Sequence, residues 1–283
     1  MTSPNKIGWI ASYPKSGNTW LRLMLWSLMQ GGAKVDINRA SSDIGIASHT
    51  ELDELLVVDA SELFADEQVA VLPALYAAIA SDTGNGLVLR KLHDRYWHTP
   101  AGAAVFPAAI SRAAVYMVRD PRDVAVSYAH HRGCPVDTII TMMADPAAML
   151  SVSSTRQRRQ LAQPLGHWSG HVLSWLEQTD IAVLLLRYED LLAEPAAGLR
   201  VVAKHFGLVV DETILAQAVA AASFDQLRDQ EQQHGFRERP VGASAPFFRQ
   251  GQAGGWRQSL TPDQAARIMA DHHAVMQRLG YCS

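Results

Sequence analysis

The sequence predicts an α/β fold: a parallel sheet of about four to five strands, flanked by helices and followed by a mostly helical C-terminal part. Short apolar runs alternate with helix-length stretches up to Phe206, and such alternation is typical of parallel strands joined by right-handed crossovers. The runs are apolar on both faces, like strands inside a parallel sheet. The chain fits one domain, residues 1–283, because a single core grows to roughly 250 to 300 residues.

Polar residues, glycine or proline bound each expected element. The expected strands are 7–12, 87–92, 113–119 and 181–187. The expected helices are 19–30, 67–80, 121–131, 166–178, 195–206, 212–222 and 262–279. Thr261 suits the N-cap of the last helix and Pro262 its first turn. Residues 229–255 are polar and glycine-rich, which predicts a functional loop or a disordered segment.

Composition and charge narrow the class of protein. With 48% hydrophobic and 19% charged residues, the chain can form a sizeable core. A formal net charge of -3 gives no electrostatic argument for nucleic acid or an anionic membrane as a partner. No apolar run approaches the roughly 18 residues of a membrane span. Cys134 and Cys282 show no metal-ligand spacing and suit a reducing compartment, so we expect a cytoplasmic protein.

Polar residues, many of them cationic, follow all four expected strands. They occupy 13–20, 91–93, 119–123 and 187–190. In open parallel sheets, ligands bind beyond the carboxyl ends of the strands. These four segments are therefore expected to form one site.

The first of these segments, 13–20, has the chemistry of a phosphate-binding loop. Gly17 allows a tight turn from strand to helix, and the free N–H groups at the helix start point toward a bound anion. Lys15 adds a positive charge, while Ser16 and Thr19 add hydroxyl donors. The segment therefore predicts a local anion site in a chain without a basic surplus.

Three segments resemble motifs of the cytosolic-type sulfotransferases, in the order of that family. Residues 13–20, Tyr-Pro-Lys-Ser-Gly-Asn-Thr-Trp, are similar to its 5'-phosphosulfate loop, in which threonine usually replaces the asparagine. Residues 118–128 resemble its 3'-phosphate segment, with Arg119 and Ser127 eight positions apart. Residues 247–256 are similar to its C-terminal Arg-Lys-Gly-x-x-Gly-Asp-Trp loop. The fold that this resemblance implies is P-loop-like.

The resemblance implies that the donor is 3'-phosphoadenosine 5'-phosphosulfate (PAPS), which leaves as PAP, and that no metal is required. Lys15 would stabilise charge on the leaving group. The other implied contacts to the 5'-phosphate are Ser16, Gly17, Asn18 and Thr19. Implied contacts to the 3'-phosphate are Arg119, Ser127, Arg249, Gln250 and Gly251. The implied contacts to the adenine are Trp20 and Phe224, and Tyr188 matches a tyrosine near the nucleotide.

His93 matches the histidine of the family's Lys-x-His segment and is the expected general base. An unperturbed histidine pKa of about 6.5 suits removal of a hydroxyl proton near neutral pH. Lys91 would steady the sulfuryl oxygens. The catalytic set that the resemblance implies is thus His93, Lys15, Lys91 and Ser127.

Two departures from the family pattern affect what the resemblance can imply. Gln250 replaces a lysine of the C-terminal loop and removes one charge from the 3'-phosphate site. Residues 257–266 do not retain the dimerisation signature of many animal members. Whether the chain forms a homo-oligomer therefore stays open.

The sequence thus predicts a sulfotransferase that acts on a hydroxyl group of a small-molecule or natural-product acceptor by in-line displacement. A P-loop-type nucleotide or small-molecule kinase is the alternative, but a Walker A loop needs glycine at position 12 and lysine at position 18, where Ser12 and Asn18 stand. A non-catalytic nucleotide-binding protein is the second alternative. The acceptor pocket is expected from 33–66, 94–106, 134–163 and 229–248.

Overall fold

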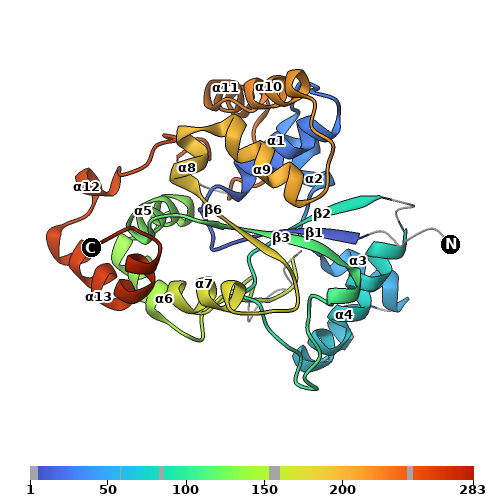
Figure 1. Ribbon diagram of the computed structural model, residues 1–283. Helices are drawn as coiled ribbons and strands as arrows, with labels where there is room; N and C mark the ends of the chain where they lie inside the picture. Colours follow the sequence, from blue (N-terminus) through green and yellow to red (C-terminus); the bar gives the residue numbers. More distant parts are fainter. Residues whose placement is uncertain (1–5, 58, 83–85, 153–159, 241–244) are drawn as a thin grey trace.

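Four parallel strands form the central sheet of the computed structural model, which describes residues 6–57, 59–82, 86–152, 160–240 and 245–283 (Figure 1). The strands are β1 (Lys6–Ser12), β2 (Leu87–Leu92), β3 (Ser111–Val118) and β6 (Val183–Arg187). Their order across the sheet is β2-β1-β3-β6, and every pairing is parallel. The prediction of a parallel sheet is confirmed, with four strands in the described residues.

The central strands β1 and β3 are mostly apolar because the sheet is covered on both faces. In β1, Trp9 and Ala11 belong to the core cluster on one face, and Ile10 belongs to the cluster on the other. In β3, Tyr116 and Met117 divide in the same way. Successive side chains of a strand point to opposite faces. A strand buried on both sides therefore needs an unbroken apolar run.

Helices pack on both faces of the sheet (Figure 1). On one face lie α1 (Asn18–Met29), α9 (Pro195–His205) and α10 (Glu212–Ala221). On the other lie α4 (Ala65–Asp82), α6 (Val136–Ala144), α7 (Trp168–Leu176) and α13 (Pro262–Arg278). The α/β class and the mostly helical C-terminal part are as predicted. None of the helices in the described ranges is both long and apolar enough to cross a membrane.

Two long helices begin where central strands end, and this arrangement positions the site. Helix α1 follows the loop after β1, and α5 (Pro121–Arg132) follows β3. The side chain of Asp120 caps α5, because its Oδ1 accepts the backbone N–H of Arg122 at 2.9 Å. The N-terminal N–H groups of both helices therefore lie at the carboxyl edge of the sheet.

Several elements were not predicted. They are α2 (Ile37–Asp43), α3 (His49–Leu56), α6, the short α8 (Tyr188–Ala193), α11 (Phe224–His234), α12 (Trp256–Ser259), the 3-10 turns Ala60–Glu62 and Ala108–Ile110, and a strand pair, β4 (Met149–Leu150) and β5 (Gln163–Pro164). The expectation that 229–255 lacks structure is wrong at its start, because α11 continues to His234. That helix is mostly polar, so it shows no apolar periodicity. Residues 241–244 of the expected loop lie outside the described residues.

The predicted elements that are present differ from their expected bounds by one or two residues at most. The helix expected at 166–178 begins at Trp168 because the side chain of His167 caps it. The ring of His167 accepts the backbone N–H of Gly170 at 3.1 Å. The strand expected at 181–187 begins at Val183.

Candidate functional site

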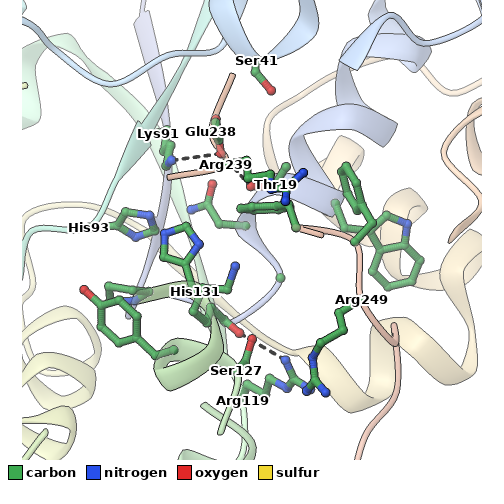
Figure 2. A pocket seen from close by; sticks show the side chains of 18 of the residues that line it. Thr19, Ser41, Lys91, His93, Arg119, Ser127, His131, Glu238, Arg239 and Arg249 are labelled. Atoms are coloured by element: carbon green, nitrogen blue, oxygen red, sulfur yellow. Dashed lines mark hydrogen bonds and ion pairs between the residues drawn. The ribbon is translucent and has the colours of Figure 1, made fainter. Parts of the chain in front are cut away.

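A cavity of about 800 Å³ lies at the carboxyl edge of the sheet (Figure 2). It is lined by fourteen of the fifteen predicted site residues, although they come from distant parts of the chain. These are Lys15, Gly17, Asn18, Thr19, Trp20, Lys91, His93, Arg119, Ser127, Tyr188, Phe224, Arg249, Gln250 and Gly251. The exception is Ser16, which is fully buried within the loop.

The loop between β1 and α1 takes a backbone conformation that favours glycine at one position and strains another. Gly17 has a φ of 96°, and a Cβ atom there would lie 2.6 Å from the ring of Tyr188. Lys15 also has a left-handed φ, of 68°, which costs a non-glycine residue on the order of 1 kcal/mol. Such strain gathers at functional sites. Here the Lys15 ammonium lies 3.8 Å from the ring centroid of Phe247.

Polar groups of this loop suit an anion. Helix α1 begins at Asn18, so the first N–H groups of the helix have no intrahelical partner. The Oγ atom of Ser16 is buried and has no hydrogen-bond partner among the described residues, and such atoms are costly without a ligand. The loop therefore offers backbone and hydroxyl donors to a phosphate.

The side chain of Asn18 faces away from the position expected for the phosphate. Its Nδ2 donates to the carbonyl oxygen of Ile10 at 2.8 Å and to Oγ of Ser12 at 3.2 Å. Its Oδ1 accepts from Nε of Arg22 at 2.9 Å. The contact implied for Asn18 is thus left to its backbone N–H, and its side chain ties the loop to β1.

Opposing effects act on the pKa of Lys15. Burial lowers the pKa of its ammonium from its ordinary value to about 7, and the neighbouring charges of Lys91 and Arg119 also lower it. The carboxylate of Glu238 acts in the opposite direction. An anion in the cavity would favour the charged form of Lys15.

The ring of His93 is oriented by the end of β1. Its Nδ1 lies 2.9 Å from the carbonyl oxygen of Ser12. A carbonyl can only accept, so Nδ1 carries the proton and Nε2 carries the lone pair. Burial and the charge of Lys91 hold the pKa of His93 well below its ordinary value. The imidazole is therefore neutral, with a free lone pair on Nε2, but it is a weaker base than the unperturbed side chain expected from the sequence.

The ring of His171 contacts the backbone of His93, and sequence reasoning missed this contact. Its Nε2 lies 3.0 Å from the carbonyl oxygen of His93, and its Nδ1 lies 2.8 Å from the hydroxyl of Tyr116. His171 is fully buried, and burial lowers its pKa to about 4. These contacts have no sequence signal, because the partners of His171 are 78 and 55 positions away in the chain.

Two arginines, Arg119 and Arg249, line the cavity away from Lys91 and Glu238 (Figure 2). The guanidinium of Arg119 lies 4.4 Å from the ring centroid of Tyr188 and donates to the carbonyl oxygen of Gln252 at 2.7 Å. Its Nε is buried without a hydrogen-bond partner in the described chain. Burial and the charge of Arg119 lower the pKa of Arg249. Two like charges in this position favour a bound anion.

Two buried carboxylates, to which no sequence motif assigns a role, hold the C-terminal loop in place. Asp123 accepts the backbone N–H groups of Gly254 at 2.6 Å and of Trp256 at 2.9 Å. Glu231 accepts those of Phe247 at 2.7 Å and Phe248 at 2.9 Å. Arg249, Gln250 and Gly251 lie between these two attachments.

Aromatic side chains line the same part of the cavity. Trp20 and Tyr188 meet edge to face, with ring centroids 6.1 Å apart, and Nε1 of Trp20 donates to the carbonyl oxygen of Ala222 at 2.9 Å. Phe224 packs so closely on Gly251 that a Cβ atom there would lie 2.5 Å from its ring. These rings offer flat apolar faces to a nucleobase.

A carboxylate that no sequence motif indicated, Glu238, also lines the cavity. It forms ion pairs with Arg22 and Lys91. Although burial acts to raise it, these two cations hold the pKa of Glu238 below its ordinary value. In the part of the chain that the structure describes, no group of three or more histidine, cysteine, aspartate or glutamate side chains could hold a metal ion.

Comparison with known proteins gives a family match over nearly the whole chain. The model of the sulfotransferase domain matches residues 6–280. Rabbit (Oryctolagus cuniculus) sulfotransferase 1C2 is 24% identical over 266 residues, covering 92% of this chain and 79% of that protein. Cytosolic sulfotransferase 16 of Arabidopsis thaliana is 26% identical over 275 residues, covering 92% and 72%. These matches agree with the resemblance that the three motifs predict.

Solved structures share the fold. Retinol dehydratase in complex with androsterone and the inactive cofactor PAP aligns with a TM-score of 0.60 and 18% identity, covering 95% of this chain and 80% of that one. Mouse sulfotransferase SULT7A1 complexed with PAP aligns with a TM-score of 0.58 and 20% identity, covering 96% and 85%.

Proposed function

The chain belongs to the sulfotransferase family, and on that premise we propose that it transfers a sulfuryl group from PAPS to a hydroxyl group of a small-molecule acceptor. The observation that carries the choice of donor is that one cavity brings together two sets of anion-binding groups. Lys15 and the start of α1 line it, and so do Arg119 and Arg249. Two such sets suit a nucleotide with phosphate groups at its 5' and 3' positions. Structures of two relatives in fold contain PAP.

The proposed reaction is an in-line displacement. The lone pair on Nε2 of His93 accepts the acceptor's hydroxyl proton as the acceptor oxygen bonds to sulfur. The bond between sulfur and the bridging phosphate oxygen breaks, and PAP leaves with that electron pair. Lys15 stabilises the charge that develops on this oxygen.

Position and preorganised charge supply most of the catalysis in this proposal. Lys91 steadies the sulfuryl oxygens, and Ser127 helps to hold the donor with Arg119. A sulfuryl group in transfer carries less negative charge than a phosphoryl group, so lysines take the part that Mg²⁺ takes in kinases. We therefore propose no metal requirement.

The remaining part of the cavity suits a polar acceptor. The lining also includes six polar side chains near α2, α3, β2 and β4, namely Ser41, Ser48, Glu51, Arg90, Ser151 and Gln160. Ile46 and Leu150 add apolar surface. A molecule with several hydroxyl groups fits this mixture better than a flat hydrocarbon would. Retinol and androsterone are ligands of retinol dehydratase and serve here as the contrasting probes.

We also propose a single domain and a cytoplasmic location. The family match over residues 6–280 supports one domain across the chain. A relative described as cytosolic supports a cytoplasmic location.

Donor binding is tested by thermal unfolding in the presence of EDTA. PAP at a hundred times its Kd is expected to stabilise the protein by about 2.7 kcal/mol, which appears as a rise in Tm. An unchanged Tm with millimolar PAP, or a larger rise with ATP and Mg²⁺, would contradict the proposal and favour a kinase. Transfer itself is tested with labelled PAPS and a panel of polyols, glycosides, phenols and steroids, read by mass spectrometry.

A further inference from the structure

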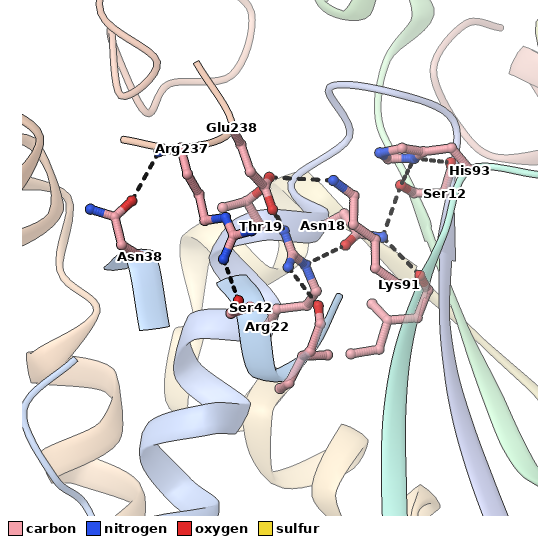
Figure 3. A network of polar contacts seen from close by, with 12 residues as sticks. Ser12, Asn18, Thr19, Arg22, Asn38, Ser42, Lys91, His93, Arg237 and Glu238 are labelled. Carbon is pink, nitrogen blue, oxygen red and sulfur yellow. Dashed lines mark hydrogen bonds and ion pairs between the residues drawn. The ribbon is translucent and has the colours of Figure 1, made fainter. Parts of the chain in front are cut away.

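Glu238 lines the cavity, and its carboxylate contacts residues of α1 and β2 (Figure 3). Its Oε1 accepts a hydrogen bond from Nη2 of Arg22 at 2.6 Å. Its Oε2 accepts from Oγ1 of Thr19 at 3.0 Å and from Nζ of Lys91 at 3.3 Å. Thr19 and Lys91 are two of the residues that are expected to contact the donor.

Arg22 anchors this carboxylate. Its side chain is 1% exposed. The remaining guanidinium contacts are neutral: Nε to Oδ1 of Asn18, Nη1 to the carbonyl oxygen of Ile44, and Nη2 to Oγ1 of Thr19. A buried guanidinium is costly without a countercharge. Glu238 supplies that countercharge, so the pair is expected to persist with or without a donor.

Hydrogen bonds also hold the backbone on both sides of Glu238. The N–H of Arg237 donates to Oδ1 of Asn38 at 2.9 Å, and its guanidinium bonds to the hydroxyl of Ser42. The next turn is closed by the N–H of Arg239, which donates to the carbonyl oxygen of Phe236 at 3.0 Å. The carboxylate therefore has a fixed place in the cavity wall.

Lys91 depends on this fixed carboxylate. Burial lowers the pKa of the Lys91 ammonium, and the carboxylate of Glu238 raises it. In the described chain, the hydrogen bond from Nζ goes to Glu238. The other charged or titratable groups around Lys91 are Arg22, Lys15, His93 and His131. Each of them is cationic or neutral, so Glu238 is the group that favours a charged Lys91.

We propose that Glu238 is a positioning residue for sulfuryl transfer: it keeps the Lys91 ammonium charged and directed into the cavity. This rests on the proposed function, in which Lys91 contacts the sulfuryl oxygens. An ammonium has three N–H donors, and Glu238 engages one of them. The others are then free for the transferring group.

The variant Glu238→Gln tests this role. Glutamine keeps the shape and can still accept from Arg22, but it lacks the charge. At pH 8 we expect kcat to fall about tenfold to a hundredfold, while the Kd of PAP changes by less than about threefold. Relative to the wild type, the loss at pH 6.5 is expected to be smaller, because a lower pH returns the proton to Lys91. A wild-type kcat at both pH values would overturn the proposal.

The matched control is Glu212→Gln, which removes another ion-paired carboxylate, that of the exposed Arg200–Glu212 pair remote from the cavity. It is expected to leave kcat and its pH dependence unchanged. Should Glu238→Gln unfold, Glu238→Asp keeps the charge but shortens the reach by one methylene. An intermediate kcat without a new pH dependence is then expected, and an unaltered kcat would overturn the proposal.

A double-mutant cycle separates positioning from general damage. In a Lys91→Met background, measured in single turnovers, Glu238→Gln is expected to change the rate by less than about twofold, because the residue through which it acts is already gone. If Glu238→Gln lowered the rate as much in this background as in the wild type, Glu238 would act through a residue other than Lys91, and the proposal would fail. If the wild type transfers no sulfuryl group to any acceptor, the proposed function itself fails, which is a distinct outcome.

Discussion

The Nδ1 atom of His93 lies 2.9 Å from the carbonyl oxygen of Ser12, the last residue of β1. This contact joins the expected base to the strand that also carries the phosphate-binding loop. The tautomer of His93 and the position of Lys15 are therefore set by one strand end. The proposed base and the proposed leaving-group stabiliser are thus both positioned by the end of one central strand.

The replacement His93→Ala is expected to lower kcat at least about a hundredfold, the scale of general-base catalysis, with a nearly unchanged Kd for PAP. The imidazole contacts the acceptor in the proposed reaction and leaves the phosphates to other residues. Steady-state kinetics and calorimetry measure the two effects. His131→Ala is the discriminating partner, because His131 also lines the cavity. Full activity in His93→Ala, with a large loss in His131→Ala, would reassign the base.

Binding of PAP is expected to weaken as pH rises above 7, by up to about tenfold per pH unit. The ammonium of Lys15 has a pKa of about 7 in the free protein, and bound phosphate raises that pKa, so binding at higher pH must take up a proton. Calorimetry between pH 7.5 and 9 avoids the second phosphate pKa of about 6. In Lys15→Arg the cation stays charged, and a shallower slope is expected. A flat wild-type profile would argue against this account.

Asp123→Asn is expected to weaken PAP binding about tenfold to a hundredfold, which corresponds to roughly 1.4 to 2.7 kcal/mol. The single oxygen of an asparagine side chain can accept the N–H of Gly254 or of Trp256. Its NH₂ group then faces the other N–H, and two donors cannot bond. The loop that carries Arg249 then loses one attachment. Calorimetry provides the Kd. Asp263→Asn, at an exposed position of α13, is the control, and equal Kd values for the two variants would count against a role for Asp123.

The free energy of unfolding is expected to fall as pH drops from 6.5 toward 4. His171 and His272 are buried, with pKa values lowered to about 4. In the unfolded chain a histidine has a pKa of about 6.5, so below that pH the unfolded state binds more protons and is favoured. Denaturant unfolding at pH 7.5 and 5 measures the fall. His272→Gln is expected to reduce it, whereas the exposed His234→Gln is not.

The residues at the strand ends could be predicted because topology alone gathers them. Parallel strands end at one edge of the sheet, so Lys15, His93 and Arg119 had to meet once their strands were recognised. The two-faced burial of β1 and β3 made those strands easy to recognise. Helix α11 escaped prediction because a polar helix without an apolar stripe leaves no periodic signal.

The supporting carboxylates could not be predicted, because their partners are distant in sequence. Asp123 binds N–H groups more than 130 positions away, and Glu238 pairs with Arg22 across 216 positions. An isolated acidic residue in a sequence is more often a solvated surface group. For Asn18, the motif indicated the right position, yet the side chain takes a structural role that depends on Arg22.

Glu231 closes the chain on itself across the sixteen positions that separate it from Phe247. A closed base determines where Arg249 lies, whatever course the intervening chain takes. That connection also carries Glu238, which Arg22 holds in place, so a change in its length leaves both attachments unmoved only where it spares that residue. One buried carboxylate thus makes the position of Arg249 independent of the length of the chain that precedes Phe247.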